Sequence, residues 1–204
     1  MTVKPNAPAC ERNKRPILEV IRVDFRDCSN ILEIGSGTGQ HAVYFAQAMP
    51  WLVWQTSDLA ENHAGIGTWI ADASLPNVRD PLLLDVQNST GFAGKYDGVF
   101  SANTAHIMSM PEVHCMFDLA GRLLPRGGRF CLYGPFNRDG DYTSESNRRF
   151  DQSLRDQDAS MGIRDLGMLD ESAARSDMRR ERLYAMPANN ALAVWRKREN
   201  AEGR

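Results

Sequence analysis

The stretch LEIGSGTGQH, residues 32–41, places three glycines at alternate positions within five residues. A run of branched apolar residues, NILEI at 30–34, leads into it, and HAVYFAQAM at 41–49 follows with apolar residues at helical spacing. This order predicts a strand, a tight turn and a helix. Glycine has no Cβ atom and adopts positive φ freely, so we expect another group to approach the backbone of this turn closely.

The alternation of strand and helix continues along the chain. Apolar runs predict strands at 52–58, 80–86, 96–103 and 127–136. Helical spacing predicts helices at 61–74, where two glycines weaken the pattern, and at 111–124, between two prolines. This alternation is typical of an α/β protein whose parallel sheet carries helices on both faces. The apolar character of 80–86 and 96–103 predicts strands that are buried on both faces.

The two ends of the chain extend this pattern. Ile17, Leu18, Ile21 and Phe25 recur at helical spacing, and Pro16 is expected in the first turn of that helix, with residues 11–15 before it or at its start. After residue 136, helices are predicted near 144–161 and 168–180. Two strands at 181–198 flank a Pro-Ala-Asn-Asn turn and predict an antiparallel hairpin. The tail at 200–204 is expected to fray.

Composition favours one compact domain over residues 1–204. The chain is 42% hydrophobic and 25% charged, and no linker, repeat or low-complexity block divides it. Within this domain we expect a helical N-terminal segment at about 9–26 and a lid-like helical insertion at about 138–165.

Charge and cysteine content exclude several classes of protein. The formal net charge of −2 argues against a broad basic surface, so we expect no nucleic-acid partner. Apolar runs fall far short of the roughly 20 residues that span a bilayer, and no secretion signal opens the chain, so we expect a cytoplasmic protein without a membrane partner. The four cysteines form no C-x-x-C pair, which predicts reduced thiols and no metal site. A homo-oligomer remains open.

The spacing of the glycines decides between cofactor classes. A dinucleotide fingerprint, G-x-G-x-x-G, needs a third glycine where Gln40 stands. A phosphate-binding P-loop needs a lysine after its last glycine, and none follows here. The sequence therefore argues against both a dinucleotide-binding loop and a P-loop.

The residues of this turn resemble a known family. E-x-G-S-G-T-G at 33–39, placed after a strand, resembles motif I of the class I S-adenosylmethionine (SAM)-dependent methyltransferases. Three further segments, together with this motif, resemble the DUF938 type of methyltransferase-like protein, which is related to the methyltransferase-like 26 proteins. These segments are PACERNKRPILEV at 8–20, TSESNRRFDQSLR at 143–155 and GIRDL at 162–166. The resemblance covers nearly the whole chain. It implies a Rossmann-like class I methyltransferase fold, with a mostly parallel seven-stranded sheet, helices on both faces and an antiparallel C-terminal strand.

The resemblance implies SAM as cofactor and assigns its contacts around the glycines. Glu33 would order the loop or reach the methionine amine. The three glycines would line the methionine and ribose portion, and Asn103 at the end of the fourth strand would meet the methionine amine. Arg12 and Asn13 would close over the cofactor carboxylate. The three glycines are Gly35, Gly37 and Gly39.

Two acids at strand ends would bind the rest of the cofactor. Asp58 ends the second predicted strand and could accept from the ribose hydroxyls. Asp85 ends the third and could accept from the adenine amine, with the backbone N–H of Val86 facing the ring. Taken alone, Asp58 could instead cap a helix, and Asp85 could simply begin a loop.

Candidates for the acceptor side lie beyond the fourth and fifth strands. His106 is a candidate general base, or else a structural histidine. Tyr133, Phe136 and Asn137 lie at the end of the fifth strand, although the aromatic residues could belong to the core. Glu145 and Asn147 lie on the lid-like insertion, whose charges could equally form a solvated face, and His41 and Arg164 are weaker candidates.

The sequence thus favours a SAM-dependent methyltransferase acting on a small-molecule acceptor. The N/D-P-P-Y signature of enzymes that methylate exocyclic base or glutamine amines is absent, because SANTAH stands after the fourth strand. One alternative is a non-catalytic cofactor-binding or scaffold protein with the same fold. A less favoured alternative is an NAD-dependent oxidoreductase, which Gln40 argues against.

Overall fold

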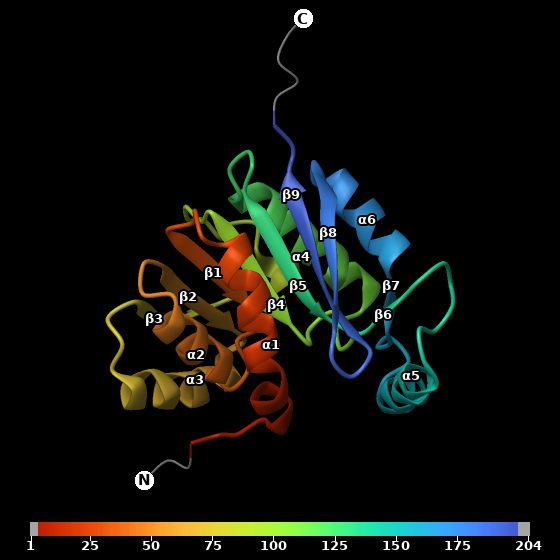
Figure 1. The fold of residues 1–204 in the computed structure, drawn as a ribbon, viewed down its shortest axis with the longest axis horizontal. Coiled ribbons are helices and arrows are strands. Elements are labelled where there is room, and N and C mark those ends of the chain that lie inside the picture. The colour runs from red at the N-terminus through yellow and green to blue at the C-terminus, as the bar shows by residue number, and fades with distance from the viewer. Residues whose placement is uncertain (1–3, 200–204) are drawn as a thin grey trace, which may run out of the picture.

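Seven strands form a single sheet in the order β3-β2-β1-β4-β5-β9-β8 in the computed structural model, which describes residues 4–199 (Figure 1). β1, β2, β3, β4 and β5 run parallel, and β9 is antiparallel to both β5 and β8. The predicted fold class, including its antiparallel C-terminal strand, is confirmed. The strands are β1 Asn30–Ile34, β2 Val53–Asp58, β3 Val78–Leu83, β4 Gly98–Ala102, β5 Arg129–Gly134, β8 Met178–Met186 and β9 Asn190–Lys197.

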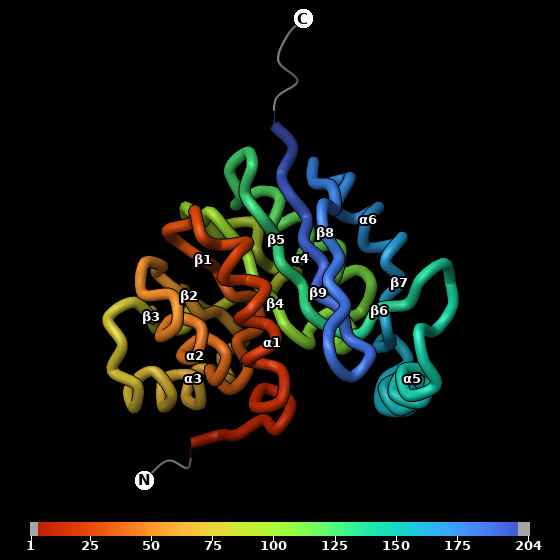
Figure 2. The backbone as a smooth tube through the Cα atoms, viewed as in Figure 1, coloured from red at the N-terminus to blue at the C-terminus, as the bar shows by residue number. Residues whose placement is uncertain are grey.

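Helices cover both faces of this sheet. α1 (Pro8–Asp24), α2 (Gln40–Ala48) and α3 (Ala60–Ala73) pack on one face. α4 (Met110–Leu123) and α6 (Leu166–Arg175) pack on the other. The chain before α1 runs along the lower edge of the molecule, below α2 and α3 (Figure 2).

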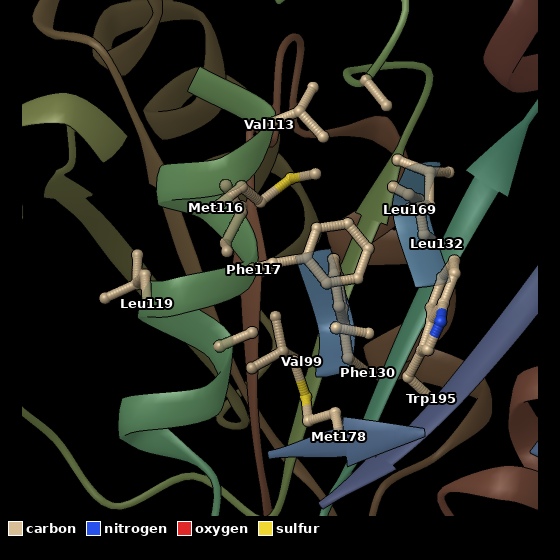
Figure 3. Packing of buried hydrophobic residues seen from close by; sticks show 14 of the residues in the cluster. Val99, Val113, Met116, Phe117, Leu119, Phe130, Leu132, Leu169, Met178 and Trp195 are labelled. Atoms are coloured by element: carbon tan, nitrogen blue, oxygen red, sulfur yellow. The ribbon is translucent and has the colours of Figure 1, made fainter. Parts of the chain in front are cut away.

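Period-two alternation of side chains along the strands builds two cores. In β5, Phe130 and Leu132 face α4, whereas Cys131 and Tyr133 face α1 and α2. On the α4 face, Phe117 of that helix lies against Phe130 and Trp195, with its ring centroid 5.0 Å from that of Trp195 (Figure 3). Such burial on both faces is the pattern that a parallel sheet between helical layers requires.

The lid-like insertion is a helix framed by two short strands. α5 (Glu145–Gln157) lies between β6 (Phe136–Asn137) and β7 (Arg164–Asp165), which pair with each other in parallel. This small sheet was not predicted, because strands of two residues carry no periodicity. Its pairing brings the two ends of the insertion together beside the main sheet, with α5 at the side (Figure 1).

The expectation that Pro16 lies in the first turn of the N-terminal helix was wrong, although the helical segment expected at about 9–26 covers nearly the same residues as α1. α1 starts at Pro8, and Pro16 lies inside it. Pro8 supplies the fixed φ that favours a helix start, whereas Pro16 removes the hydrogen bond to the carbonyl of Arg12 and crowds that carbonyl with its ring. Burial of Ile17 and Ile21 against the sheet stabilises the helix across this break.

Three other local predictions were wrong. β3 is not buried on both faces, because it is an edge strand, and Leu82 and Leu83 are exposed. It ends at Leu83, so Asp85 follows the strand by two residues and caps the short 3-10 helix η1 (Val86–Asn88). The helix predicted at 168–180 ends at Arg175, since Met178 already begins β8. The expectation for the tail at 200–204 falls outside the described residues.

Candidate functional site

A cavity of about 760 Å³ opens at the carboxyl ends of β1, β2 and β4. β1 lies between β2 and β4 in the sheet, so the strand order runs one way from β1 to β3 and the other way from β4 to β5. Open α/β sheets bind ligands at such a switch point. Five parts of the chain form its walls: the segment before and at the start of α1, the glycine loop, the start of α3, the segment after β3 and the segment after β4. The lining residues are Pro5, Ala7, Ala9, Cys10, Ile34, Gly35, Ser36, Gly37, Thr38, His41, Asp58, Leu59, Glu61, Asn62, Gly65, Leu84, Asp85, Val86, Ala102, Asn103, Thr104, Ile107, Met108 and Glu112.

Gly35 and Gly37 serve this cavity in different ways. Gly35 has φ +72°, and a Cβ there would come 2.6 Å from Cγ2 of Thr104, so glycine is needed to bring the loop against the segment after β4. Gly37 has φ +58° and open space around its missing Cβ. A side chain at residue 37 would fill that space and strain the backbone. Gly39, also at positive φ, does not line the cavity and instead packs against α3.

Asp58 fixes the glycine loop to the end of β2. Its Oδ2 accepts from the N–H of Gly37 at 2.7 Å. Its Oδ1 accepts from the N–H of Leu59 and from Nδ2 of Asn62, both at 2.8 Å. A carboxylate offers about four lone-pair sites, so these three bonds leave room for one further donor on the cavity side.

Glu33 lies beneath the loop and does not line the cavity. It is 1% exposed, and Nε1 of Trp54 donates to its Oε2 at 3.1 Å. The pKa of Glu33 is raised to about 7, because burial, with a smaller contribution from the nearby Asp58, outweighs the hydrogen bonds from Trp54 and Ser36 that lower it. Glu33 therefore supports the loop from below.

Three predicted contacts do line the cavity beyond the loop: Asp85, Val86 and Asn103. The carboxylate of Asp85 accepts from the N–H of Gln87 at 2.9 Å and from Nδ2 of Asn88 at 2.6 Å, so the turn it caps fixes its position. Asn103 has φ +60°, a left-handed conformation that asparagine tolerates better than most residues.

The N-terminal candidates lie behind the cavity wall. Asn13 is buried, and its Oδ1 lies 2.7 Å from Nε2 of His41, whereas Arg12 is exposed. Neither residue lines the cavity, but His41 does, and its Nδ1 lies 3.9 Å from Sγ of Cys10. Burial raises the pKa of the Cys10 thiol to about 11 and lowers that of His41 to about 4, so both are neutral near pH 7.

His106 is buried next to the cavity rather than in its wall. Its ring lies 5.2 Å from that of Phe150 on α5, and burial and the nearby Arg164 lower its pKa to about 4. Arg164, itself buried, donates to the carbonyls of Ala105 at 3.0 Å, Ser160 at 2.8 Å and Met108. These bonds tie the segment after β4, which borders the cavity, to the loop after α5.

The five acceptor-side candidates are not gathered in this cavity. Tyr133 is buried at the end of β5, and Phe136 lines a separate hollow of about 300 Å³ near the β8–β9 turn. Asn147 donates to Oγ1 of Thr143 and to the carbonyl of Asn189, which gives it a structural role. The remaining two lie apart, with Glu145 exposed on α5 beside two arginines and Oδ1 of Asn137 buried without a hydrogen-bond partner in the described chain.

The charged residues of the cavity wall are all acidic. Asp58, Glu61, Asp85 and Glu112 line it, and no lysine or arginine of residues 4–199 does. An unpaired anion would meet carboxylates there without a compensating cation, whereas a cation would be stabilised.

Several lining residues were not expected from the sequence. Pro5, Ala7, Ala9 and Cys10 form the N-terminal wall, and small apolar residues of this kind carry no chemical signature. Asn62 had a detectable signal, since it stands four residues after Asp58 at the start of a predicted helix, where the two side chains can meet.

Comparison with family models gives one match over nearly the whole chain. The model described as "Protein of unknown function (DUF938)" matches residues 4–197.

Within residues 4–199, no helix is both long and apolar enough to cross a membrane.

Solved structures with the same fold include proteins described as methyltransferases, at low sequence identity. An O-methyltransferase family protein from Burkholderia thailandensis matches with a TM-score of 0.82 at 14% identity, over 94% of this chain and 58% of its own. Human N-acetylserotonin methyltransferase, solved in complex with SAM, matches with a TM-score of 0.80 at 12% identity, over 94% of this chain and 53% of its own. PigF, solved with SAH, matches with a TM-score of 0.78 at 17% identity, over 92% and 56%. The chain thus spans little more than half the length of these proteins, and the likeness establishes the class I methyltransferase fold.

Proposed function

This chain belongs to the DUF938 family, and we propose that it is a SAM-dependent methyltransferase acting on a small-molecule acceptor. The fold it shares with SAM-dependent methyltransferases supports the reaction class. The cavity at the sheet's switch point supports the site.

The charge of the cavity wall carries this proposal. SAM brings a sulfonium and an ammonium group, so its net charge is positive, whereas NAD brings a negatively charged pyrophosphate. The wall favours the cationic ligand, because no lysine or arginine from residues 4–199 lines it. Its charged residues are Asp58, Glu61, Asp85 and Glu112. The same feature disfavours the NAD-dependent alternative, together with Gln40 in place of the fingerprint glycine.

We assign the cofactor's parts along the wall from β4 to β3. The methionine end would lie against Gly35, Gly37 and Asn103, and the open space at the missing Cβ atom of Gly37 leaves room for it. Asp58 would accept from one ribose hydroxyl at its remaining lone pair, and Asn62 beside it would serve the other. The adenine would lie near Leu84 and Val86, with its amine donating to Asp85.

Methyl transfer then requires alignment more than acid–base chemistry. The acceptor's lone pair forms a bond to the methyl carbon, the carbon–sulfur bond breaks with its electrons going to sulfur, and the acceptor's proton leaves to solvent or to a base. The acceptor would approach past Ile107 and Met108. His106 stays a candidate base, because its imidazole is neutral near pH 7. The relation to methyltransferase-like 26 proteins is a separate prediction. The protein's contribution is proximity and the exclusion of water.

Calorimetric titration with SAM and, separately, with NAD tests the cofactor. We expect heat of binding with SAM and none with NAD at millimolar concentration. The reverse result would overturn the proposal in favour of the oxidoreductase. Incubation with methyl-labelled SAM and a metabolite extract then tests catalysis. Binding without any labelled product would favour the non-catalytic alternative.

A further inference from the structure

Residues 4–11, which we call the N-terminal strap, form one wall of the cofactor cavity. Pro5, Ala7, Ala9 and Cys10 of the strap line the cavity. The strap crosses from α3 to α2, two helices far along the chain from it (Figure 2). It therefore covers a site that the rest of the fold would leave more open.

Gln40, at the position where a dinucleotide fingerprint would have glycine, holds the strap through its amide group. Its Oε1 accepts from the N–H of Ala7 at 2.6 Å and from Oγ1 of Thr38 at 2.9 Å. Its Nε2 donates to Oδ1 of Asn6 at 2.9 Å and to Oε1 of Glu11 at 2.8 Å. Two acceptor sites and two donors are the full capacity of a glutamine amide, and the side chain is 2% exposed.

The partners also fix the orientation of this amide. A backbone N–H can only donate and an ionised carboxylate can only accept, so Ala7 and Glu11 together determine which atom is oxygen and which is nitrogen. Three of the four bonds lead to the strap, and the fourth leads to the glycine loop. The amide thus links the strap to the loop beneath the cofactor.

The outer end of the strap is attached to α3. Nε1 of Trp69 donates to the carbonyl of Pro5 at 2.7 Å. The ammonium group of Lys4 pairs with Asp72 and lies 3.6 Å from the centre of the Trp69 ring. These contacts are mostly polar and partly exposed, so they resist opening less than the buried apolar contacts of Ile17 and Ile21 farther along α1.

We propose that Gln40 is a positioning residue that latches the N-terminal strap over the cofactor, and that the cofactor is released when this latch opens. The inference rests on the proposed function for its ligand, but the latch itself exists without one. Loss of the latch lets the strap open more often, which speeds release and weakens binding. A purely structural role for Gln40 would change stability and leave release unaltered.

Three variants test the latch. Gln40→Ala removes all four bonds. Gln40→Glu keeps the shape, but it loses the donor and sets a second carboxylate against Glu11. The double variant Gln40→Glu with Glu11→Gln exchanges the two groups, so residue 40 still accepts from Ala7 and residue 11 now donates. Glu19→Gln, an exposed position on α1, is the matched control.

Two measurements on the full-length protein distinguish the outcomes. Amide hydrogen exchange at Ala7 reports the latch in ligand-free protein, and we expect exchange about tenfold or more faster in Gln40→Ala and Gln40→Glu, with recovery in the double variant. SAM release, followed by displacement with excess SAH, should accelerate by about the same factor and recover in the same order. Global unfolding is monitored by melting temperature.

The results separate this inference from the proposed function. If the wild-type protein binds no SAM, the proposed cofactor is overturned, and exchange at Ala7 still decides on the latch. Equal exchange at Ala7 in wild-type protein and Gln40→Ala would overturn the latch. The latch would also be overturned if the double variant released SAM as fast as Gln40→Glu. Release at the wild-type rate in folded Gln40→Ala would overturn it as well. Faster release with recovery in the double variant supports it.

Discussion

Asp58 joins the loop, the strand end and the cavity through one carboxylate. Replacing it in Asp58→Ala removes the acceptor for the N–H of Gly37 and the proposed acceptor for a ribose hydroxyl. We expect SAM affinity to fall by about 1–3 kcal/mol, or roughly 5- to 150-fold. Calorimetric titration measures this change, with Glu171→Ala on the exposed face of α6 as control. Unchanged affinity in folded Asp58→Ala would remove this residue from the site.

Glu33 makes stability depend on pH. Its pKa is raised from 4.5 to about 7 by burial, so the folded state holds its proton at pH values where the unfolded chain has lost it. The stabilisation is complete below pH 4.5 and is lost as pH rises towards about 7, by up to about 3 kcal/mol. We expect Glu33→Gln, which can still accept from Trp54, to remove this loss.

Urea unfolding at several pH values between 4.5 and 8 measures the effect. The difference in unfolding free energy between Glu33→Gln and the wild-type protein should grow with pH in favour of the variant. Glu19→Gln on α1 is the control, since its side chain is exposed. A constant difference across this range would show that Glu33 is ionised in the folded protein throughout.

Individual residues differ in how far the sequence could predict them. Asp58, Asp85 and Gly37 were predictable, because their chemistry and their place after a strand both point to the cavity. Cys10 was not predictable as a lining residue, because nothing local says which face of a helix meets a distant cavity. Gln40 was noticed only as a missing glycine, and its four bonds appear only when the strap folds back over it.

The α5 insertion depends on one buried acid. Asp151 accepts from the N–H of Ile163 at 2.6 Å, from the hydroxyl of Tyr142 at 2.8 Å and from Nε of Arg155 at 2.7 Å. Its side chain is 2% exposed, so Asp151→Ala leaves the buried N–H of Ile163 without a partner. We expect a loss of about 1–3 kcal/mol in unfolding free energy.

The loss should be local before it is global. Hydrogen exchange should quicken across 142–163 in Asp151→Ala, while α4 and β5 keep their protection. Asp156→Ala on the exposed face of the same helix is the control, because among residues 4–199 its carboxylate accepts only from Gln152. Uniform loss of protection over the whole chain would show that α5 does not open independently.

Elements were predictable where periodicity was long and strong. α2 and α4 follow their predicted bounds within about one residue, since apolar residues recur along each at helical spacing. α3 does so as well, although Gly65 and Gly67 weaken its pattern. The place of Pro16 inside α1 was not predictable, because Pro8 and Pro16 both suit a first turn and only the packing of Ile17 and Ile21 carries the helix through Pro16. Exposure of β3 also follows from its place at the sheet edge, which no single strand reveals.

At the scale of the whole molecule, a bound cofactor should stabilise the fold. SAM at 100 times its dissociation constant adds about 2.7 kcal/mol to the unfolding free energy. For a chain of 204 residues we expect the melting temperature to rise by about 5–10 °C. Differential scanning fluorimetry checks this, with NAD at equal concentration as the control ligand. No shift with SAM, or an equal shift with NAD, would contradict the proposed cofactor.

The sequence by itself determined the fold class, the glycine loop and the two acids, one at the end of β2 and one just after β3. These depend on local patterns: apolar periodicity, the need for positive φ in a turn, and carboxylates after strands. Only the tertiary structure decided that Glu33 is buried, that His106 lies behind the wall, and that Gln40 binds the N-terminal strap. The reason is that burial and hydrogen bonding between segments 29 or more residues apart depend on how whole elements pack, which no local pattern encodes.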